Sequence, residues 1–159
     1  MALYGRTPIP LIAAAILLST LLAYKLYAPK VDPADMKLYP DDLQLVAEGK
    51  ALYAGHCASC HGATLEGQSN WRERNAKGLL PAPPHDENGH TWHHDDASLF
   101  KVTKHGPQIV AGPDYKSDMP AFEDVLSDRD IVAVLSYIKS TWPAEVRATH
   151  DEINRRAGQ

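Results

Sequence analysis

The stretch that decides the fold is GKALYAGHCASCHG, residues 49–62, which holds both cysteines of the 159-residue chain. Cys57 and Cys60 stand three positions apart, so a disulfide between them would close too short a loop to join distant parts of the chain. A stabilising disulfide framework is therefore excluded. The two thiols must serve local chemistry.

Cys57, Cys60 and His61 form the C-x-x-C-H pattern, which is typical of covalent attachment of a c-type haem. The two thiols add to the two vinyl groups of the porphyrin, and His61 follows directly as the proximal iron ligand. A thioredoxin-like redox pair would need a βαβ setting, and the chain has no strand pattern. Half a zinc site would need a second cysteine pair, which is absent from the sequence. The motif predicts one covalently bound haem c.

Length and charge limit the class of protein. With 159 residues and 44% hydrophobic content, the chain has room for one small folded domain. The formal charge is −4, and the lysines and arginines form no basic stripe. Nucleic acid is therefore not expected as a partner.

The N-terminal part is strongly apolar and predicts a single transmembrane helix. Residues 9–24 carry no charge, and residues 9–28 approach the length that a hydrocarbon core of about 30 Å requires. Residues 1–8 would be a short cytoplasmic N-terminus. Residues 29–40, rich in proline, would be an extended linker between the membrane and the domain.

A cleaved signal peptide is the alternative for the same segment. Cleavage needs small residues at the last and third-last positions. Cutting after Ala23 places Leu21 at the third-last position, and cutting after Ala28 places Leu26 there. We therefore expect an uncleaved anchor.

The remaining pattern predicts an all-α domain with a long loop. One helix begins at Asp41 or Asp42 and delivers Cys57, with Leu43, Val46, Lys50 and Tyr53 recurring on helical spacing. Residues 62–94 are rich in glycine, proline and histidine and predict a loop wrapped around something functional. Three further helices are expected: one from the Asp95 cap to Gly106, one after a capping box at Ser127 and Asp130, and a polar one from Pro143 to about Arg156.

The order of these segments resembles the class I cytochrome c family. GKALYAGHCASCHG is followed by DMPAF at residues 118–122 and by LSDRDIVAVLSYIKSTWP at residues 126–143. The resemblance covers about residues 43–142. It implies a cytochrome c fold, with three main helices and short ones around one haem, in a domain of residues 41–142 followed by a helical tail of residues 143–159. It also implies a close crossing of the first and last helices through Gly49, Tyr53 and Tyr137.

The resemblance also supplies a second iron ligand. Met119, before a proline, matches the distal methionine of the family, whereas Met1 and Met36 lie outside the predicted domain. A thioether opposite imidazole favours iron(II) and raises the reduction potential. Around the haem, a proline carbonyl would orient His61, with Pro83 our choice, and Trp92 would cover the haem edge or the core.

A cluster of histidines leaves an alternative open. His85, His90, His93, His94 and His105 invite either a bis-histidine haem or a bound copper or zinc ion. Loop histidines beside acidic and amide residues are more often solvated or locally hydrogen-bonded. Met119 is therefore the expected ligand.

The sequence as a whole predicts an electron carrier rather than an enzyme. It would pass single electrons between membrane respiratory or dehydrogenase partners, with the haem domain on the periplasmic side of the cytoplasmic membrane, because haem is attached after export. Two alternatives stay open. The chain could be a haem subunit of a redox enzyme, with an open iron, or a copper-binding or copper-sensing module that uses the histidine-rich loop.

Overall fold

The computed structural model describes residues 13–14, 16, 19 and 36–158. The chain divides into two compact units, Met1–Lys30 and Val31–Gln159. In the first unit the described residues are helical, and the Ser19 hydroxyl donates to the Ile16 carbonyl at 2.8 Å. Each unit is considered by itself.

The predicted anchor of residues 9–28 lies mostly outside the described residues. Within the described ranges, no helix has both the length and the apolar character needed to cross a bilayer. The predicted N-terminal segment of residues 1–8 also lies outside them.

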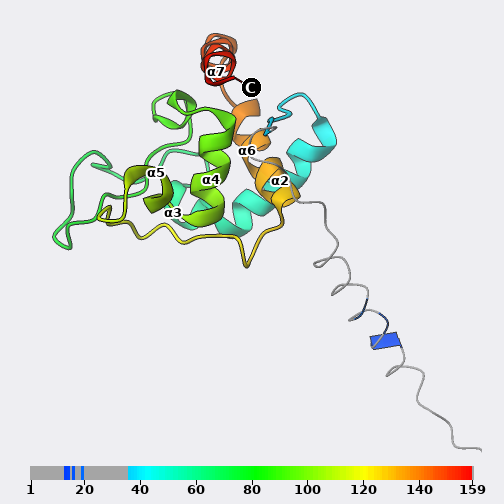
Figure 1. Cartoon of the computed structure of the whole chain (residues 1–159), viewed down its shortest axis with the longest axis horizontal. Coiled ribbons are helices and arrows are strands. Elements are labelled where there is room, and N and C mark those ends of the chain that lie inside the picture. The colour runs from blue at the N-terminus through cyan, green and yellow to red at the C-terminus, as the bar shows by residue number, and fades with distance from the viewer. Residues whose placement is uncertain (1–12, 15, 17–18, 20–35, 159) are drawn as a thin grey trace, which may run out of the picture. The chain divides into compact units, whose positions relative to one another are not determined.

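The second unit is built from helices and loops, and its described residues include no strand (Figure 1). The elements in chain order are α2 (Leu43–His56), α3 (Ala58–His61), the 3₁₀ turn η2 (Thr91–His93), α4 (Asp96–His105), α5 (Gln108–Ala111), α6 (Asp128–Ser140) and α7 (Ala144–Ala157). The predicted all-α class is confirmed.

The helices begin where the sequence provides side-chain caps. Asp42 accepts from the backbone N–H of Leu45 at 3.0 Å, at the start of α2. Ser127 and Asp130 form the predicted capping box at the start of α6, each side chain accepting a backbone N–H of the other. Such caps satisfy donors that the first turn leaves unpaired. They explain why these boundaries could be read from the sequence.

α2 and α6 cross at very short range in the centre of the domain (Figure 1). A Cβ atom added to Gly49 would lie 1.9 Å from the carbonyl oxygen of Ala133, so only glycine allows this approach. The rings of Tyr53 and Tyr137 lie beside it, with centroids 5.6 Å apart. The crossing implied by the resemblance to class I cytochromes is present.

The buried face of α2 differs from the periodic set that the sequence suggested. Leu45, Gly49 and Tyr53 are buried, whereas Leu43 is 82% exposed. Leu43 is the first helical residue, and the side chain of a first-turn residue need not follow the stripe that packs against α6. The core-facing stripe starts two residues later.

Residues 36–42, which we call the leading segment, pack into the domain. Met36 and Leu38 are 1% and 3% exposed and belong to the hydrophobic core. The Leu38 N–H donates to Asp96 Oδ2 at 2.9 Å, and the Tyr39 N–H donates to Ser136 Oγ at 2.9 Å. The expected boundary between linker and domain at residue 40 therefore falls inside a packed region. Two buried side chains are too few to produce a periodic signal.

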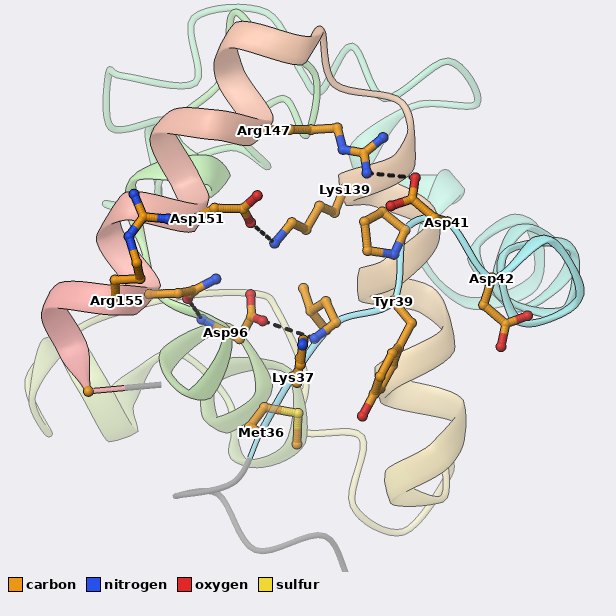
Figure 2. Close-up of a pocket in the computed structure, with 14 residues that line it drawn as sticks. Met36, Lys37, Tyr39, Asp41, Asp42, Asp96, Lys139, Arg147, Asp151 and Arg155 are labelled. Atoms are coloured by element: carbon orange, nitrogen blue, oxygen red, sulfur yellow. Dashed lines mark hydrogen bonds and ion pairs between the residues drawn. The ribbon is translucent and has the colours of Figure 1, made fainter.

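α7 packs on the domain mainly through polar side chains, although the sequence suggested that this tail had little to bury. His150 is fully buried, and its Nε2 lies 2.9 Å from the His94 carbonyl oxygen. Asn154 accepts from the Asp96 N–H at 2.8 Å. Figure 2 shows the cavity of about 760 Å³ that remains between α7 and the leading segment, with charged side chains along its walls.

Candidate functional site

α2 delivers the two cysteines to one end of the helix crossing. The Cys57 N–H donates to the Tyr53 carbonyl at 2.9 Å and ends α2, and α3 follows at once. This short helix carries Cys60 and ends on His61. Both thiols are free, Cys57 partly buried and Cys60 exposed. The backbone thus presents two unpaired thiols and an imidazole within about one helical turn.

The raised pKa of the Cys57 thiol argues against a thioredoxin-like redox pair. Burial, and to a lesser extent the nearby Cys60, raise the pKa of its thiol to about 11. A nucleophilic redox cysteine needs a lowered pKa, because the thiolate is the reactive form. A partly buried, protonated thiol with no βαβ setting in the described domain fits instead a residue that is consumed in thioether attachment.

His61 is held in the state and orientation that an iron ligand requires. Its side chain is buried, and its Nδ1 lies 2.8 Å from the carbonyl oxygen of Pro83. Burial lowers the pKa of His61, with the Pro83 carbonyl acting in the opposite direction. The ring is therefore neutral, donates from Nδ1 and keeps the Nε2 lone pair for a metal. The residues present fit haem c.

The loop after α3 brings Pro83 to His61 through backbone hydrogen bonds. The Gly67 N–H donates to the His61 carbonyl at 2.7 Å, and the Gln68 N–H donates to the Ala82 carbonyl at 2.8 Å. Gly67 has φ of 68°, and a Cβ atom there would lie 2.4 Å from the nitrogen of Pro84. Only glycine allows this turn, so the returning chain is specified locally. Among the prolines of this stretch, the one chosen from the sequence makes the contact.

Tyr53 and His85 were both named from the sequence, but their contacts with the C-x-x-C-H segment were not predicted. The Tyr53 hydroxyl donates to the Gly62 carbonyl at 2.9 Å, which ties α2 to the residue after the motif. The ring of His85 stacks on the ring of His61, with centroids 3.9 Å apart. The sequence had grouped His85 with the histidines that could ligate the haem iron or bind a copper or zinc ion. A contact between rings 24 positions apart leaves no periodic trace that could have revealed it.

Met119 lies in the loop between α5 and α6, partly buried and packed against the hydrophobic core that Cys57 also contacts. Its N–H donates to Ser117 Oγ at 3.0 Å. Three residues later the Phe122 N–H donates to the Lys104 carbonyl at 3.1 Å, at the end of α4. The loop is therefore held on both sides of the methionine.

Trp92 covers part of the core at the turn η2. Its ring packs against the core, and its Nε1 donates to the Glu87 carbonyl at 3.2 Å. The other face lies against His93, with ring centroids 3.7 Å apart. The indole therefore closes the outside of the loop that carries Pro83.

The histidines do not form one cluster. His85 turns inward to His61, whereas the Nε2 atoms of His90 and His94 lie 3.1 Å apart near the surface, and His105 pairs with Glu123 at 3.0 Å. Among the described residues, no group of three or more histidine, cysteine, aspartate or glutamate side chains is arranged to hold a metal ion. The geometry thus gives the copper-module alternative no support.

The helix crossing at Gly49 and the C-x-x-C-H segment beside it define a class, the c-type cytochromes. Residues 44–138 match the family model described as cytochrome c oxidase, cbb3-type, subunit III. The chain belongs to this family. Its cofactor is covalently attached haem c.

A curated relative extends the comparison. The chain is 32% identical over 107 residues to the cbb3-type cytochrome c oxidase subunit FixP of Azorhizobium caulinodans. The alignment covers 67% of this chain and 33% of the relative, so the matched region spans about a third of that protein. No solved structure matches the chain significantly.

Proposed function

We propose that the chain carries single electrons through one haem c held by four of its side chains. Cys57 and Cys60 form the two thioether bonds, His61 is the proximal iron ligand, and Met119 is the distal one. When bound, the haem supplies a one-electron iron(III)/iron(II) couple. The chain's own residues attach it, orient one ligand, and limit access to the other.

The observation that carries this proposal is the hydrogen bond between His61 Nδ1 and the Pro83 carbonyl oxygen, at 2.8 Å. Metal-ligating histidines commonly donate their second nitrogen to a carbonyl or carboxylate, which fixes the tautomer and raises the basicity of the ligand. Here that bond is present directly after two free thiols. Any buried histidine needs a hydrogen-bond partner, so it is the combination of this bond with the two adjacent free thiols that favours iron ligation.

Met119 is favoured over the other methionines by its position. Met36 is 1% exposed and contacts the cavity beside α7, and Met1 lies outside the described residues. Met119 is partly buried in a loop that is tied to α4, so its thioether can face a cofactor next to the core. Because a soft thioether stabilises iron(II), this ligand suits a carrier of respiratory potential.

We further propose that the domain works within a membrane respiratory assembly. The relative's name states that it is an oxidase subunit, and residues 9–24 of this chain are long and uncharged. The anchor of residues 9–28 would tether the haem domain on the periplasmic side. The redox partner would be an oxidase or a dehydrogenase of the same membrane.

The ligand assignment is tested by comparing Met119→Ala with Met36→Leu as the matched control. Ferric haem with methionine ligation shows a weak far-red absorption band. We expect Met119→Ala to lose this band, to keep its covalent haem, and to bind carbon monoxide rapidly, whereas Met36→Leu keeps the band. A band that persists in Met119→Ala would overturn the assignment. Rapid carbon monoxide binding by the unmodified protein would instead favour the alternative of a redox enzyme with an open iron.

The proposed assembly is tested by purifying the full chain from its membrane with a mild detergent. We expect haem-containing respiratory subunits to co-purify with it and to reduce or oxidise its haem within the complex. A version in which a cleavable signal peptide replaces residues 1–30 should still be exported, keep the haem and lose membrane association. If that version remains in the membrane fraction after a salt wash, the anchor is wrong.

A further inference from the structure

His85 lies face to face with the proposed iron ligand. The centroids of the His61 and His85 rings are 3.9 Å apart, and their planes differ by 21°. The His85 N–H donates to the Leu65 carbonyl at 2.8 Å, which places its backbone directly across the loop from the motif. The stack therefore depends on a specific backbone contact.

A hydrogen bond also holds the imidazole of His85. Its Nδ1 lies 2.7 Å from Oγ1 of the buried Thr91, and the same hydroxyl donates to the Pro84 carbonyl at 3.4 Å. The contact of 2.7 Å with Thr91 holds the plane of the His85 ring whichever of the two groups donates the proton. On another side, the ring meets the edge of Tyr53, with centroids 6.2 Å apart and an interplanar angle of 72°.

A leucine in place of His85 could fill the same space without needing a hydrogen-bond partner. The imidazole of His85 is partly buried, so it is partly desolvated, and that cost is offset only where its polar atoms are hydrogen-bonded. Thr91 provides such a bond. The side chain therefore has a specified ring plane, which a simple core-filling residue would not require.

The stack with His85 restrains the rotation of the His61 ring, which the hydrogen bond to Pro83 leaves free. A hydrogen bond tolerates misalignment of some tens of degrees, so the bond at Nδ1 alone lets the His61 ring swing about its Cβ–Cγ bond. A flat ring at 3.9 Å stops that swing. The same neutral π face lies against the ligand whose positive charge increases when iron loses an electron, and a π face stabilises adjacent positive charge.

We propose that His85, fixed by Thr91, is a positioning residue that sets the ring plane of the proximal ligand His61 and lowers the reduction potential of the site. This inference rests on the proposed function, because it requires His61 to ligate the iron. It adds a determinant of potential that lies on the proximal side and is independent of Met119.

The test compares His85→Leu, His85→Phe and Thr91→Val in the full, haem-loaded chain, with the exposed His93→Leu as the matched control. Two readouts are used. The reduction potential is measured by spectroelectrochemistry, and the ligand plane is measured by the pattern of haem methyl resonances in the NMR spectrum of the oxidised protein. Neither readout reports on fold stability.

We expect His85→Leu to shift the oxidised-to-reduced ratio at a fixed applied potential about threefold to tenfold toward the reduced form. This corresponds to about 30–60 mV, at 59 mV per tenfold for a one-electron couple. The methyl pattern should change as well. His85→Phe keeps a flat face, so it should retain the methyl pattern while raising the potential by less, and Thr91→Val should produce a smaller change in both.

The proposal is overturned if His85→Leu matches the unmodified protein in both readouts, or if His93→Leu produces equal shifts. If His85→Leu fails to retain haem, the other two variants decide the question. The proposal is then overturned if neither His85→Phe nor Thr91→Val changes the reduction potential or the methyl pattern. Failure of the proposed function looks different. The unmodified protein would then lack the spectrum of histidine–methionine ligation before any variant is made.

Discussion

The domain is held together by two interfaces of opposite chemistry. α2 and α6 meet through glycine, alanine and tyrosine so closely that the Gly49 position has no room for a side-chain atom. α7 meets α4, α6 and the leading segment through a buried histidine and an asparagine. Ion pairs that Figure 2 shows add to these contacts. The stability of the first interface depends on the volume of its side chains. The stability of the second depends on whether each polar atom has a hydrogen-bond or ion-pair partner.

The difference shows where each kind of change is tolerated. An apolar crossing at this range cannot expand without moving a helix, and α2 carries the haem-attachment motif at its end. The polar interface leaves a cavity beside it and lies on the side of the domain where the leading segment enters. We therefore expect volume changes to act on the first interface, and changes of charge or pH to act on the second.

The largest effect is expected from Gly49→Ala. The added Cβ atom would lie 1.9 Å from the Ala133 carbonyl oxygen, so α2 and α6 must separate. We expect a loss of about 3 kcal/mol in the free energy of unfolding, at the upper end for overpacked cores, measured by urea denaturation of the haem-loaded protein. Gly55→Ala is the matched control, because it lies on the same helix with no atom within 4 Å, and it should gain about 0.5–1 kcal/mol. Equal effects of the two would contradict the tight crossing.

A smaller effect is expected from Asp151→Asn in the polar interface. Lys139 Nζ lies 2.6 Å from Asp151 Oδ1, and the lysine side chain is only 5% exposed whereas the aspartate is half exposed. The substitution leaves a buried ammonium group without its counter-ion, which water only partly replaces, so we expect a loss of about 1–3 kcal/mol in unfolding free energy. The neighbouring Glu152→Gln, on an exposed part of α7, should leave unfolding unchanged. A Lys139→Met variant that is as unstable as Asp151→Asn would argue against an unpaired charge as the cause.

The polar interface should also be sensitive to acid through His150. Burial lowers the pKa of this ring, and Lys139 adds to the lowering, while Asp96, the His94 carbonyl and Asp151 oppose it. Above pH about 6.5, neither the folded nor the unfolded state protonates the ring. Below that pH the unfolded state binds the proton more readily, so stability falls as pH falls, by at most about 1.4 kcal/mol per pH unit for this group.

The measurement is the free energy of unfolding at several pH values between 7.5 and 5, in the unmodified protein and in His150→Gln. We expect His150→Gln to be less stable at neutral pH and to depend less steeply on pH. Other histidines with lowered pKa, such as His85 and His94, leave some slope in both proteins. Identical slopes would show that His150 is not the responsible group.

The smallest effect is expected from Arg147→Ala. Arg147 pairs with Asp41 at 2.7 Å, but the aspartate is 83% exposed, so solvent and salt screen the pair. We expect a loss of at most about 1 kcal/mol in unfolding free energy, reduced further in high salt. A loss as large as that of Asp151→Asn would mean that the leading segment is held mainly by this one contact.

Much of the domain was predictable from local sequence signals. The caps at Asp42, Asp95 and Ser127 set the starts of three helices, because each side-chain oxygen bonds a backbone N–H only a few positions away. The Gly49 crossing followed from a resemblance to class I cytochromes. Packing of the leading segment and of α7 was not predictable, because their contacts join residues far apart in the chain, such as Leu38 with Asp96 and Asp96 with Asn154.

In the candidate site, too, the local features were predictable from the sequence and the long-range contacts were not. The C-x-x-C-H spacing of Cys57, Cys60 and His61 is written in consecutive residues, so the sequence by itself determined the cofactor and the class of protein. Only the tertiary structure decided that Pro83 meets His61, that His85 stacks on it, and that His90 and His94 pair with each other elsewhere. The reason is that a ligand motif is local chemistry, whereas the position of a loop residue depends on how the whole chain returns to it.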